Sequence, residues 1–247
     1  MTGVLRKTAR IVFGSLLPRI AYPVVRGPLQ GAQFVLGSLE GKGGGATVYF
    51  NMMEPEQTAA MAASLKKGHV FFDIGANVGF YTVLGARQVG SSGKVLAFEP
   101  VARNLAYLFR HVELNKLRNV MIVSAACSDS VSLAMFTAGE NNAMGHLAGD
   151  GSADNRVSLV PTVSVDSVVQ RTGLTPHVMK IDVEGAELAV LEGARTTLKV
   201  HGPAIFLSTH SSELRTACLD CLKGHSYQCE ILGPDKEDPS AFLAHRT

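Results

Sequence analysis

The stretch from His69 to Gly79 reads HVFFDIGANVG and carries the strongest indication of the fold. It begins with apolar and aromatic residues typical of a buried strand, and the next segment, YTVLGARQVG, has helical periodicity. Gly75 and Gly79 allow the backbone to pass close to a ligand, and the helix N-terminus offers free N–H groups. The stretch therefore predicts a ligand-binding turn between a strand and a helix.

The alternation of strands and helices continues to the end of the chain. Further strand-like runs are KVLAFEP, NVMIVSAA, HVMKIDV, PAIFLSTH, YQCEIL and AFLAHR, and most gaps between them have helical periodicity, including ELAVLEGARTTLKV. This pattern predicts an α/β fold with a mostly parallel seven-stranded sheet covered by helices on both faces. Residues 127–168 interrupt the pattern and predict an inserted β-hairpin, whose loop at 139–156 is long enough to cover a substrate.

Residues 1–66 form an extension ahead of the main domain, which we place at 67–247. The N-terminus is basic and apolar, but its longest apolar run is about half the length of a membrane-spanning helix. It predicts either a helix packed on the domain or a helix lying on a membrane surface. A strand at Ala32–Leu36, a flexible glycine-rich loop and a helix at 55–68 are expected to follow.

Composition and charge describe an ordinary globular enzyme. Of 247 residues, 46% are hydrophobic and 18% charged, and a net charge of +2 without a basic stripe argues against a nucleic-acid partner. Four unevenly spaced cysteines make no disulfide framework, so we expect a cytoplasmic protein, with membrane contact through the basic N-terminal segment as an alternative. Cys218 and Cys221 lie in a helical segment and are expected to pack rather than bind metal.

An acidic residue, Glu99, ends the strand that follows the glycine turn. A carboxylate at this place can accept hydrogen bonds from both ribose hydroxyls of an adenosine. Nicotinamide enzymes share the feature, but the turn has the spacing G-x-x-x-G instead of their G-x-G-x-x-G. The sequence therefore favours S-adenosylmethionine as cofactor, with an NAD(P)-dependent oxidoreductase as the alternative.

The segment KIDVEGAE places several charged residues at the end of a central strand. Lys180 and Asp182 share one face of that strand, and a lysine covered on both faces of a sheet needs a partner, for which we expect Asp73 or Glu187. Asp182 ends the strand in the same crevice as the glycine turn. Glu187 falls in the first turn of the next helix, where the helix dipole alone explains an acid.

A histidine, His210, ends the strand PAIFLSTH. Such a residue is as often a satisfied core histidine as a functional one. If its strand neighbours the one that ends in Asp182, however, His210 becomes a candidate proton acceptor.

The motifs FFDIGANVGFYT, LAFEP, AACSD and MKIDVEGAELAVLEGA, with the late strand that ends in histidine, resemble the FkbM-type methyltransferases over roughly residues 70–232. The resemblance implies a Rossmann-like class I methyltransferase domain, S-adenosylmethionine as methyl donor and, usually, O-methylation of a sugar, glycan or natural product. It assigns the cofactor site to Asp73, Gly75, Ala76, Asn77, Gly79 and Phe80 in the turn, Glu99 and Pro100 at the ribose, and Ala126, Ser128 and Asp129 at the adenine.

The resemblance also implies that Asp182 and Glu184 face the methyl group and its acceptor. We expect Asp182 or His210 to accept the hydroxyl proton and Glu184 to orient the acceptor. Many members carry an acid two residues before the histidine, where this chain has Ser208. Because few oxygen ligands remain on that strand, we expect catalysis without a metal ion. The acceptor is expected to be a small molecule or glycan, and a non-catalytic cofactor-binding protein is the remaining alternative.

Overall fold

The computed structural model describes residues 18–38, 45–138, 145–147, 157–233 and 237–247. The expected membrane-surface helix falls mostly on residues outside these ranges. Most of the loop at 139–156 and of the glycine-rich loop also lies outside them.

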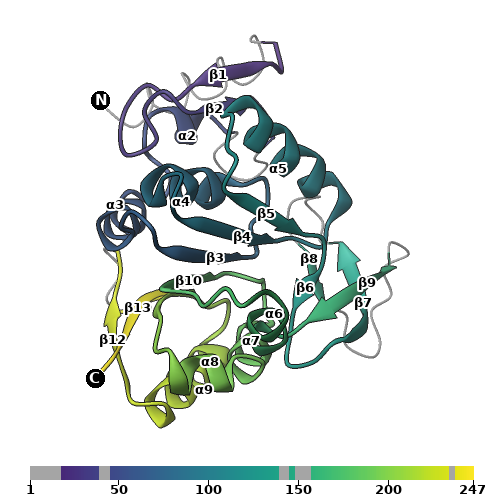
Figure 1. Ribbon diagram of the computed structural model, residues 1–247, viewed down its shortest axis with the longest axis vertical. Helices are drawn as coiled ribbons and strands as arrows, with labels where there is room; N and C mark the ends of the chain where they lie inside the picture. The colour runs from purple at the N-terminus through teal and green to yellow at the C-terminus, as the bar shows by residue number, and fades with distance from the viewer. Residues whose placement is uncertain (1–17, 39–44, 139–144, 148–156, 234–236) are drawn as a thin grey trace.

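A seven-stranded sheet forms the centre of the molecule (Figure 1). Its strands are β3 (Val70–Ile74), β4 (Lys94–Phe98), β5 (Val120–Val123), β10 (Val178–Ile181), β11 (Ala204–Ser208), β12 (Tyr227–Ile231) and β13 (Ala241–Arg246). They lie in the order β12-β13-β11-β10-β3-β4-β5, and only the pairings of β13 are antiparallel. The predicted mostly parallel sheet is confirmed. Strand order reverses beside β3, so β3 and β10 end in the crevice where such sheets bind ligands.

Helices cover both faces of the sheet because alternate strand residues are buried on opposite sides (Figure 1). The helices are α2 (Ala46–Tyr49), α3 (Pro55–Ser64), α4 (Phe80–Val89), α5 (Ala102–Leu114), α6 (Val165–Thr172), α7 (Glu187–Glu192), α8 (Arg195–Val200) and α9 (Ser212–Gly224). Phe71 belongs to the core under α3 and α4, whereas Phe72 belongs to the core under α6 to α9.

Two predicted helices differ from the structure. The segment ELAVLEGARTTLKV forms two helices instead of one, because the helix is interrupted at Gly193. The backbone packs so closely there that a Cβ on Gly193 would lie 2.1 Å from the carbonyl oxygen of Ser128. Asp166 then caps the second helix by accepting hydrogen bonds from the backbone N–H groups of Thr196 and Thr197. The helix predicted at 55–68 ends earlier, at Ser64, because the next residue, a buried leucine, is extended.

The extension packs directly on the sheet. It contributes α2, α3 and a two-stranded sheet of β1 (Ala21–Pro23) and β2 (Gln33–Val35), close to the predicted strand. Phe34 and Met61 lie in the same core as Phe71. The side chain of Asn115 in α5 pairs with the backbone of Gln33, at 2.8 Å in both directions. The extension and the sheet therefore share one hydrophobic core, and the boundary at residue 66 stays a prediction.

The inserted hairpin forms a second sheet beside the end of β5 (Figure 1). Its strands, in the order β6-β9-β7-β8, are β6 (Ala126–Cys127), β7 (Ser132–Ala138), β8 (Gly145–Leu147) and β9 (Val157–Val163). The antiparallel pairing of β7 with β9 confirms the predicted hairpin. In the described ranges, no helix combines the length and apolar character that crossing a membrane requires.

Candidate active site

The turn after β3 brings two strand ends into close contact. Gly75 has a φ of +80°, and a Cβ there would lie 1.9 Å from the carbonyl oxygen of Asp182. Gly79 has a φ of +92° and begins α4, where a Cβ would lie 2.6 Å from the Leu108 side chain. Both positions require glycine because of the backbone angle and the space.

A buried histidine supports this turn from behind. The Nε2 of His111 accepts a hydrogen bond from the Val35 N–H at 3.0 Å, so its Nδ1 carries the proton and donates to the Val78 carbonyl at 2.6 Å. Burial lowers the pKa of His111, which keeps the ring neutral in this role. The extension is thereby tied to the turn.

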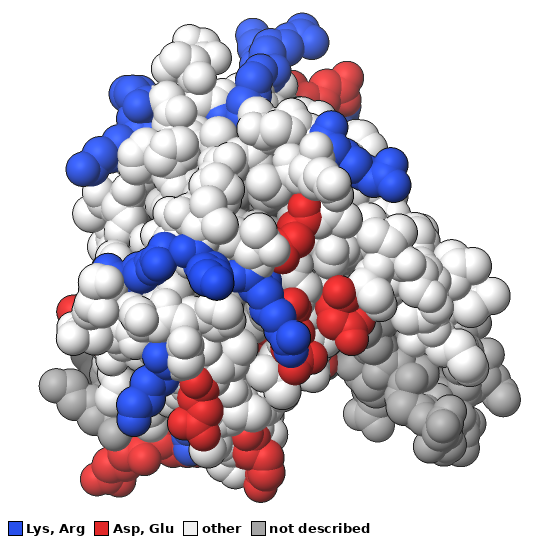
Figure 2. Space-filling model, turned by 60° about the horizontal axis from the view of Figure 1, so that its bottom comes forward, with Lys and Arg blue, Asp and Glu red and all other residues white. Residues whose placement is uncertain are grey.

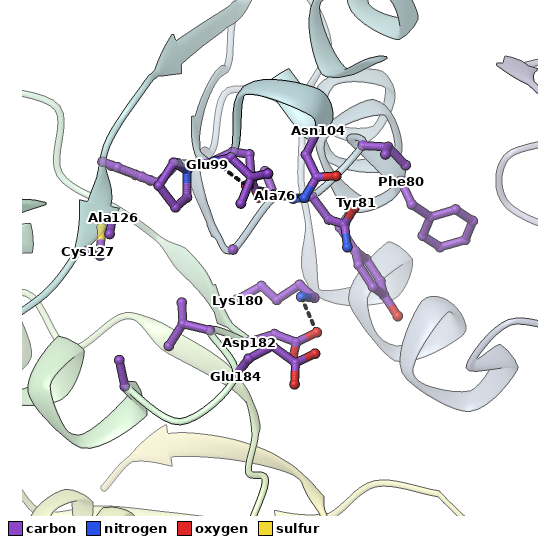
Figure 3. A pocket seen from close by; sticks show the side chains of 18 of the residues that line it. Ala76, Phe80, Tyr81, Glu99, Asn104, Ala126, Cys127, Lys180, Asp182 and Glu184 are labelled. Atoms are coloured by element: carbon purple, nitrogen blue, oxygen red, sulfur yellow. Dashed lines mark hydrogen bonds and ion pairs between the residues drawn. The ribbon is translucent and has the colours of Figure 1, made fainter. Parts of the chain in front are cut away.

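Glu99 lies at the end of β4, opposite the end of β10 across a cavity (Figure 3). One carboxylate oxygen accepts the backbone N–H of Asn77 at 2.8 Å, and the other accepts those of Val101 at 2.8 Å and the Asn104 side chain at 3.3 Å. Burial raises the pKa of Glu99, and the three hydrogen bonds limit the increase. Each oxygen has two acceptor positions, so the first oxygen can still accept a ligand hydroxyl.

The cavity brings together most of the predicted site residues and leaves out five. Its walls include the predicted Gly75, Ala76, Asn77, Phe80, Glu99, Pro100, Ala126, Asp182 and Glu184. The predicted residues that do not line it are Asp73, Gly79, Ser128, Asp129 and His210, the last of which lines a second cavity. Asp73 is fully buried and accepts a hydrogen bond from Thr82 at 2.5 Å.

Sequence reasoning missed several residues of the cavity wall. Asn104 and Phe136 line it, as do Glu54 and Tyr81. Asn104 lies in the first turn of α5, and its burial is visible only in the folded chain. Glu54 comes from the extension and gave no signal. The Tyr81 hydroxyl donates to its carboxylate at 2.6 Å.

The buried lysine pairs with the next acid on its own strand. The Nζ of Lys180 lies 2.8 Å from Asp182 and 5.0 Å from the centre of the Tyr81 ring (Figure 3). The expected partners Asp73 and Glu187 do not form this ion pair. Asp73, the register neighbour of Lys180 on β3, acts on it through its charge only. Burial alone would raise the pKa of Asp182, but Lys180 outweighs it and the pKa is lowered.

His210 lies among three carboxylates. Its Nε2 is 3.5 Å from Asp182 and 3.3 Å from Glu184, and its Nδ1 is 2.7 Å from Glu187. The hydrogen bond with Glu187 is the main reason that the pKa of His210 rises to about 9, and Glu184 and Asp182 add to it against burial. Burial also raises the pKa of Glu184.

A second cavity adjoins the first beside Asp182 and Glu184. It is lined by Glu54, Glu56, Gln57, Asp182, Glu184, Ser208, Thr209, His210, Leu232, Gly233, Ser240 and Ala241. Glu54, Asp182 and Glu184 line both cavities, so they stand where two ligands would meet.

One atom each of Asp182, Glu184 and His210 lies within 4.8 Å of the others, a spacing that a cation could use. The same carboxylates contact Lys180 and His210, which both carry or can carry a positive charge. The expected catalysis without a metal ion stays a prediction.

Comparison with known proteins agrees with this fold. A family model described as the methyltransferase FkbM domain matches residues 73–238. No curated protein sequence matches the chain.

Three solved structures show the same fold. The methyltransferase FkbM from Methylobacillus flagellatus KT is 17% identical, with a TM-score of 0.53 over 81% of this chain and 52% of that one. A proposed rRNA methylase from Clostridium thermocellum is 11% identical, with a TM-score of 0.52 over 77% and 92% of the two chains. Aeropyrum pernix fibrillarin, in complex with natively bound S-adenosyl-L-methionine, is 12% identical, with a TM-score of 0.50 over 77% and 76%.

The sheet order and the cavity above it define a Rossmann-like, class I methyltransferase fold. The match over residues 73–238 shows that the chain belongs to the FkbM methyltransferase family, whose methyl donor is S-adenosylmethionine. This agrees with the expected cofactor and disfavours the NAD(P) alternative. The residues present fit the cofactor, because Gly75 keeps the turn clear of Asp182 and Glu99 retains acceptor capacity for hydroxyls.

Proposed function

We propose that this protein methylates a hydroxyl group of a sugar, glycan or natural product. The proposal rests mainly on the position of His210, which lies beside Asp182 and Glu184 where the two cavities meet. A hydroxyl is a poor nucleophile, so a base in hydrogen-bond reach accelerates its reaction by about 10²–10⁴-fold.

The proposed roles follow from the charges around each group. The turn after β3 and Glu99 bind S-adenosylmethionine, which supplies an activated methyl group. Lys180 keeps Asp182 ionised and a weak base, so Asp182 orients the acceptor. Neutral His210 accepts the hydroxyl proton at Nε2, on the side of the crevice. Glu184 accepts a hydrogen bond from the acceptor and holds its hydroxyl in line with the methyl group, and this alignment accelerates the transfer.

The second cavity supports a small-molecule or glycan acceptor over a nucleic acid. Glu54, Glu56, Asp182 and Glu184 line it, and their charge disfavours phosphate groups. On the face shown in Figure 2, Lys and Arg are interspersed with Asp and Glu instead of forming one basic surface. Because a proposed rRNA methylase shares the fold, RNA belongs among the acceptors to be tested.

The test is methyl transfer from labelled S-adenosylmethionine to sugars, glycosides, hydroxylated natural products and RNA. Transfer to a hydroxyl of one of the first three classes supports the proposal. Transfer only to RNA, or cofactor binding without transfer to any acceptor, contradicts it. Activity that is lost with a chelator and restored by Mg²⁺ would show that a metal ion acts here.

Two variants test the residues. His210→Ala and Asp182→Asn should each lower turnover by at least about 10²-fold while leaving cofactor affinity nearly unchanged. His201→Ala, which removes an exposed histidine after α8, is the matched control and should keep full activity. Full activity in both active-site variants would place the chemistry elsewhere in the crevice.

A further inference from the structure

Glu187 is a buried carboxylate that lines neither cavity. It is the first residue of α7 and its side chain is 0% exposed. One oxygen accepts the Gly185 N–H at 3.1 Å and lies 2.7 Å from the Nδ1 of His210. The other oxygen is buried and has no hydrogen-bond partner among the described residues. A buried charge in this state is unfavourable unless a strong partner compensates for it.

The helix dipole does not explain why this acid is buried. An acid in the first turn of a helix interacts with the dipole while it remains exposed to solvent. Glu192, at the other end of α7, has a 40% exposed side chain and pairs with Arg195 at the surface. The feature that distinguishes Glu187 is its contact with His210, which points to a role for that contact.

The contact determines which ring nitrogen faces the crevice. An ionised carboxylate only accepts hydrogen bonds, so the Nδ1 of His210 must carry a proton. When the ring is neutral, its free lone pair is then on Nε2, the nitrogen that lies 3.3 Å from Glu184 and 3.5 Å from Asp182. Without this partner the proton could lie on either nitrogen, and the ring could rotate.

We propose that Glu187 is a positioning residue: it fixes the orientation of His210 and keeps its proton on Nδ1, so that Nε2 can take the proton of the acceptor. The proposal rests on the proposed function in one respect, that His210 is the base. Glu187 touches neither cavity and acts only through His210.

The charges around His210 set the size of the effect. Glu187 faces it from α7, and Asp182 and Glu184 face it from the loop after β10. Glu54 and Glu56 line the same cavity. Glu187→Gln keeps the shape of the side chain and removes one of these charges, along with the strongest hydrogen bond to the ring. The other carboxylates remain, so the pKa of His210 should fall by about one unit or more and not lose its whole increase.

The direct test is an NMR titration of the His210 ring nitrogens in the protein without cofactor or acceptor. The wild-type ring should show the Nδ1–H form when neutral. Glu187→Gln should lower the pKa of His210 and populate the Nε2–H form, because the amide can donate to Nδ1. Glu192→Gln, on the same helix, should change neither. An Nε2–H ring in the wild type, or an unchanged pKa and ring form in Glu187→Gln, would overturn the proposal.

Kinetics separate this proposal from the proposed function. Above pH 9, where His210 is largely neutral in both proteins, Glu187→Gln should lower kcat by at least about tenfold and leave KM for cofactor and acceptor within about threefold. The acidic limb of its pH profile should shift downward, so the loss should shrink toward pH 7. If His210→Ala keeps full turnover, the proposed function fails, although the NMR result can still hold. If His210→Ala is inactive and Glu187→Gln keeps the wild-type kcat and pH profile, only the positioning role fails.

Discussion

The buried lysine at the end of β10 offers a sharp test of the site's electrostatics. Lys180 has a side chain that is 3% exposed, lies 2.8 Å from Asp182 and is the register neighbour of the fully buried Asp73. Lys180→Met keeps most of the apolar stem and removes the charge. Two carboxylates then lose their nearest positive charge at once.

The structure sets the expected magnitude. Removing one partner of a buried ion pair costs about 3–5 kcal/mol, because the other charge is left uncompensated. Asp182 is 26% exposed, so water compensates part of that loss, and we expect Lys180→Met to lower the free energy of unfolding by about 2–4 kcal/mol at pH 7. Domains of this kind have a free energy of unfolding of about 5–15 kcal/mol, so the variant should still fold.

The loss should depend on pH in a defined direction. Lys180 lowers the pKa of Asp182 in the folded protein, so this pair contributes stability above the usual value of 3.8 and loses it as pH falls below that value. Without the lysine, burial raises the pKa of Asp182, as it already raises that of Asp73. As pH falls, Asp182 in the variant takes up a proton and no longer carries an uncompensated charge. The difference in the free energy of unfolding from wild type should therefore shrink between pH 7 and pH 4.

Urea unfolding followed by circular dichroism at several pH values measures both effects. Lys199→Met, which removes an exposed lysine of α8, should change stability by less than about 0.5 kcal/mol. In Lys180→Met combined with Asp182→Asn, the loss should be smaller than the sum of the two single losses. A loss below about 1 kcal/mol, or one that is constant with pH, would show that Lys180 does not compensate a buried charge.

Three other predictions concern the glycine turn, the carboxylate proposed to bind the ribose and the proposed base. Glu99→Gln should weaken S-adenosylmethionine binding by about 1.5–3 kcal/mol in calorimetry, and unchanged affinity would exclude Glu99 from the site. Gly75→Ala should destabilise the fold by at least about 3 kcal/mol in thermal melts, because the positive φ adds about 1–2 kcal/mol to a clash at 1.9 Å. The control Gly173→Ala, with a φ of +69° and no atom within 4 Å, should lose only the about 1–2 kcal/mol that comes from the backbone angle. Because the pKa of His210 is raised to about 9, only about 1% of its side chain is neutral at pH 7. The value of kcat/KM should therefore rise about tenfold per pH unit from pH 6 toward pH 9. A flat pH profile would exclude His210 as the base.

The sheet could be predicted from the sequence because each strand is a local pattern. β3, β4 and β10 are buried on both faces, so they are mostly apolar, with Asp73 and Lys180 as the buried exceptions. The break between α7 and α8 could not be predicted in this way. It depends on Ser128 and Asp166, which are distant in sequence and come to Gly193 and Thr197 only in the folded chain.

The same distinction holds for the candidate site. Gly75, Glu99 and Asp182 end or follow strands, and position in the fold was enough to predict that they meet. The partner of Lys180 and the contact of Glu187 with His210 depend on side-chain directions that periodicity does not give. Glu187 in particular looks like an ordinary first-turn acid until β11 brings His210 to it.

Under the proposed function, the charges at the end of β10 favour the transfer of a proton to His210. Lys180 pairs with Asp182, while Glu184 and Glu187 would stabilise the imidazolium that His210 becomes when it takes the proton. S-adenosylmethionine carries a positive sulfonium and becomes neutral when it loses its methyl group, so the positive charge of the site is conserved if His210 gains it. The pKa of His210 should therefore be lower with S-adenosylmethionine bound than with the demethylated product, because like charges oppose each other. NMR titration of the two complexes measures the difference, and equal pKa values would mean that the cofactor's charge does not act on His210.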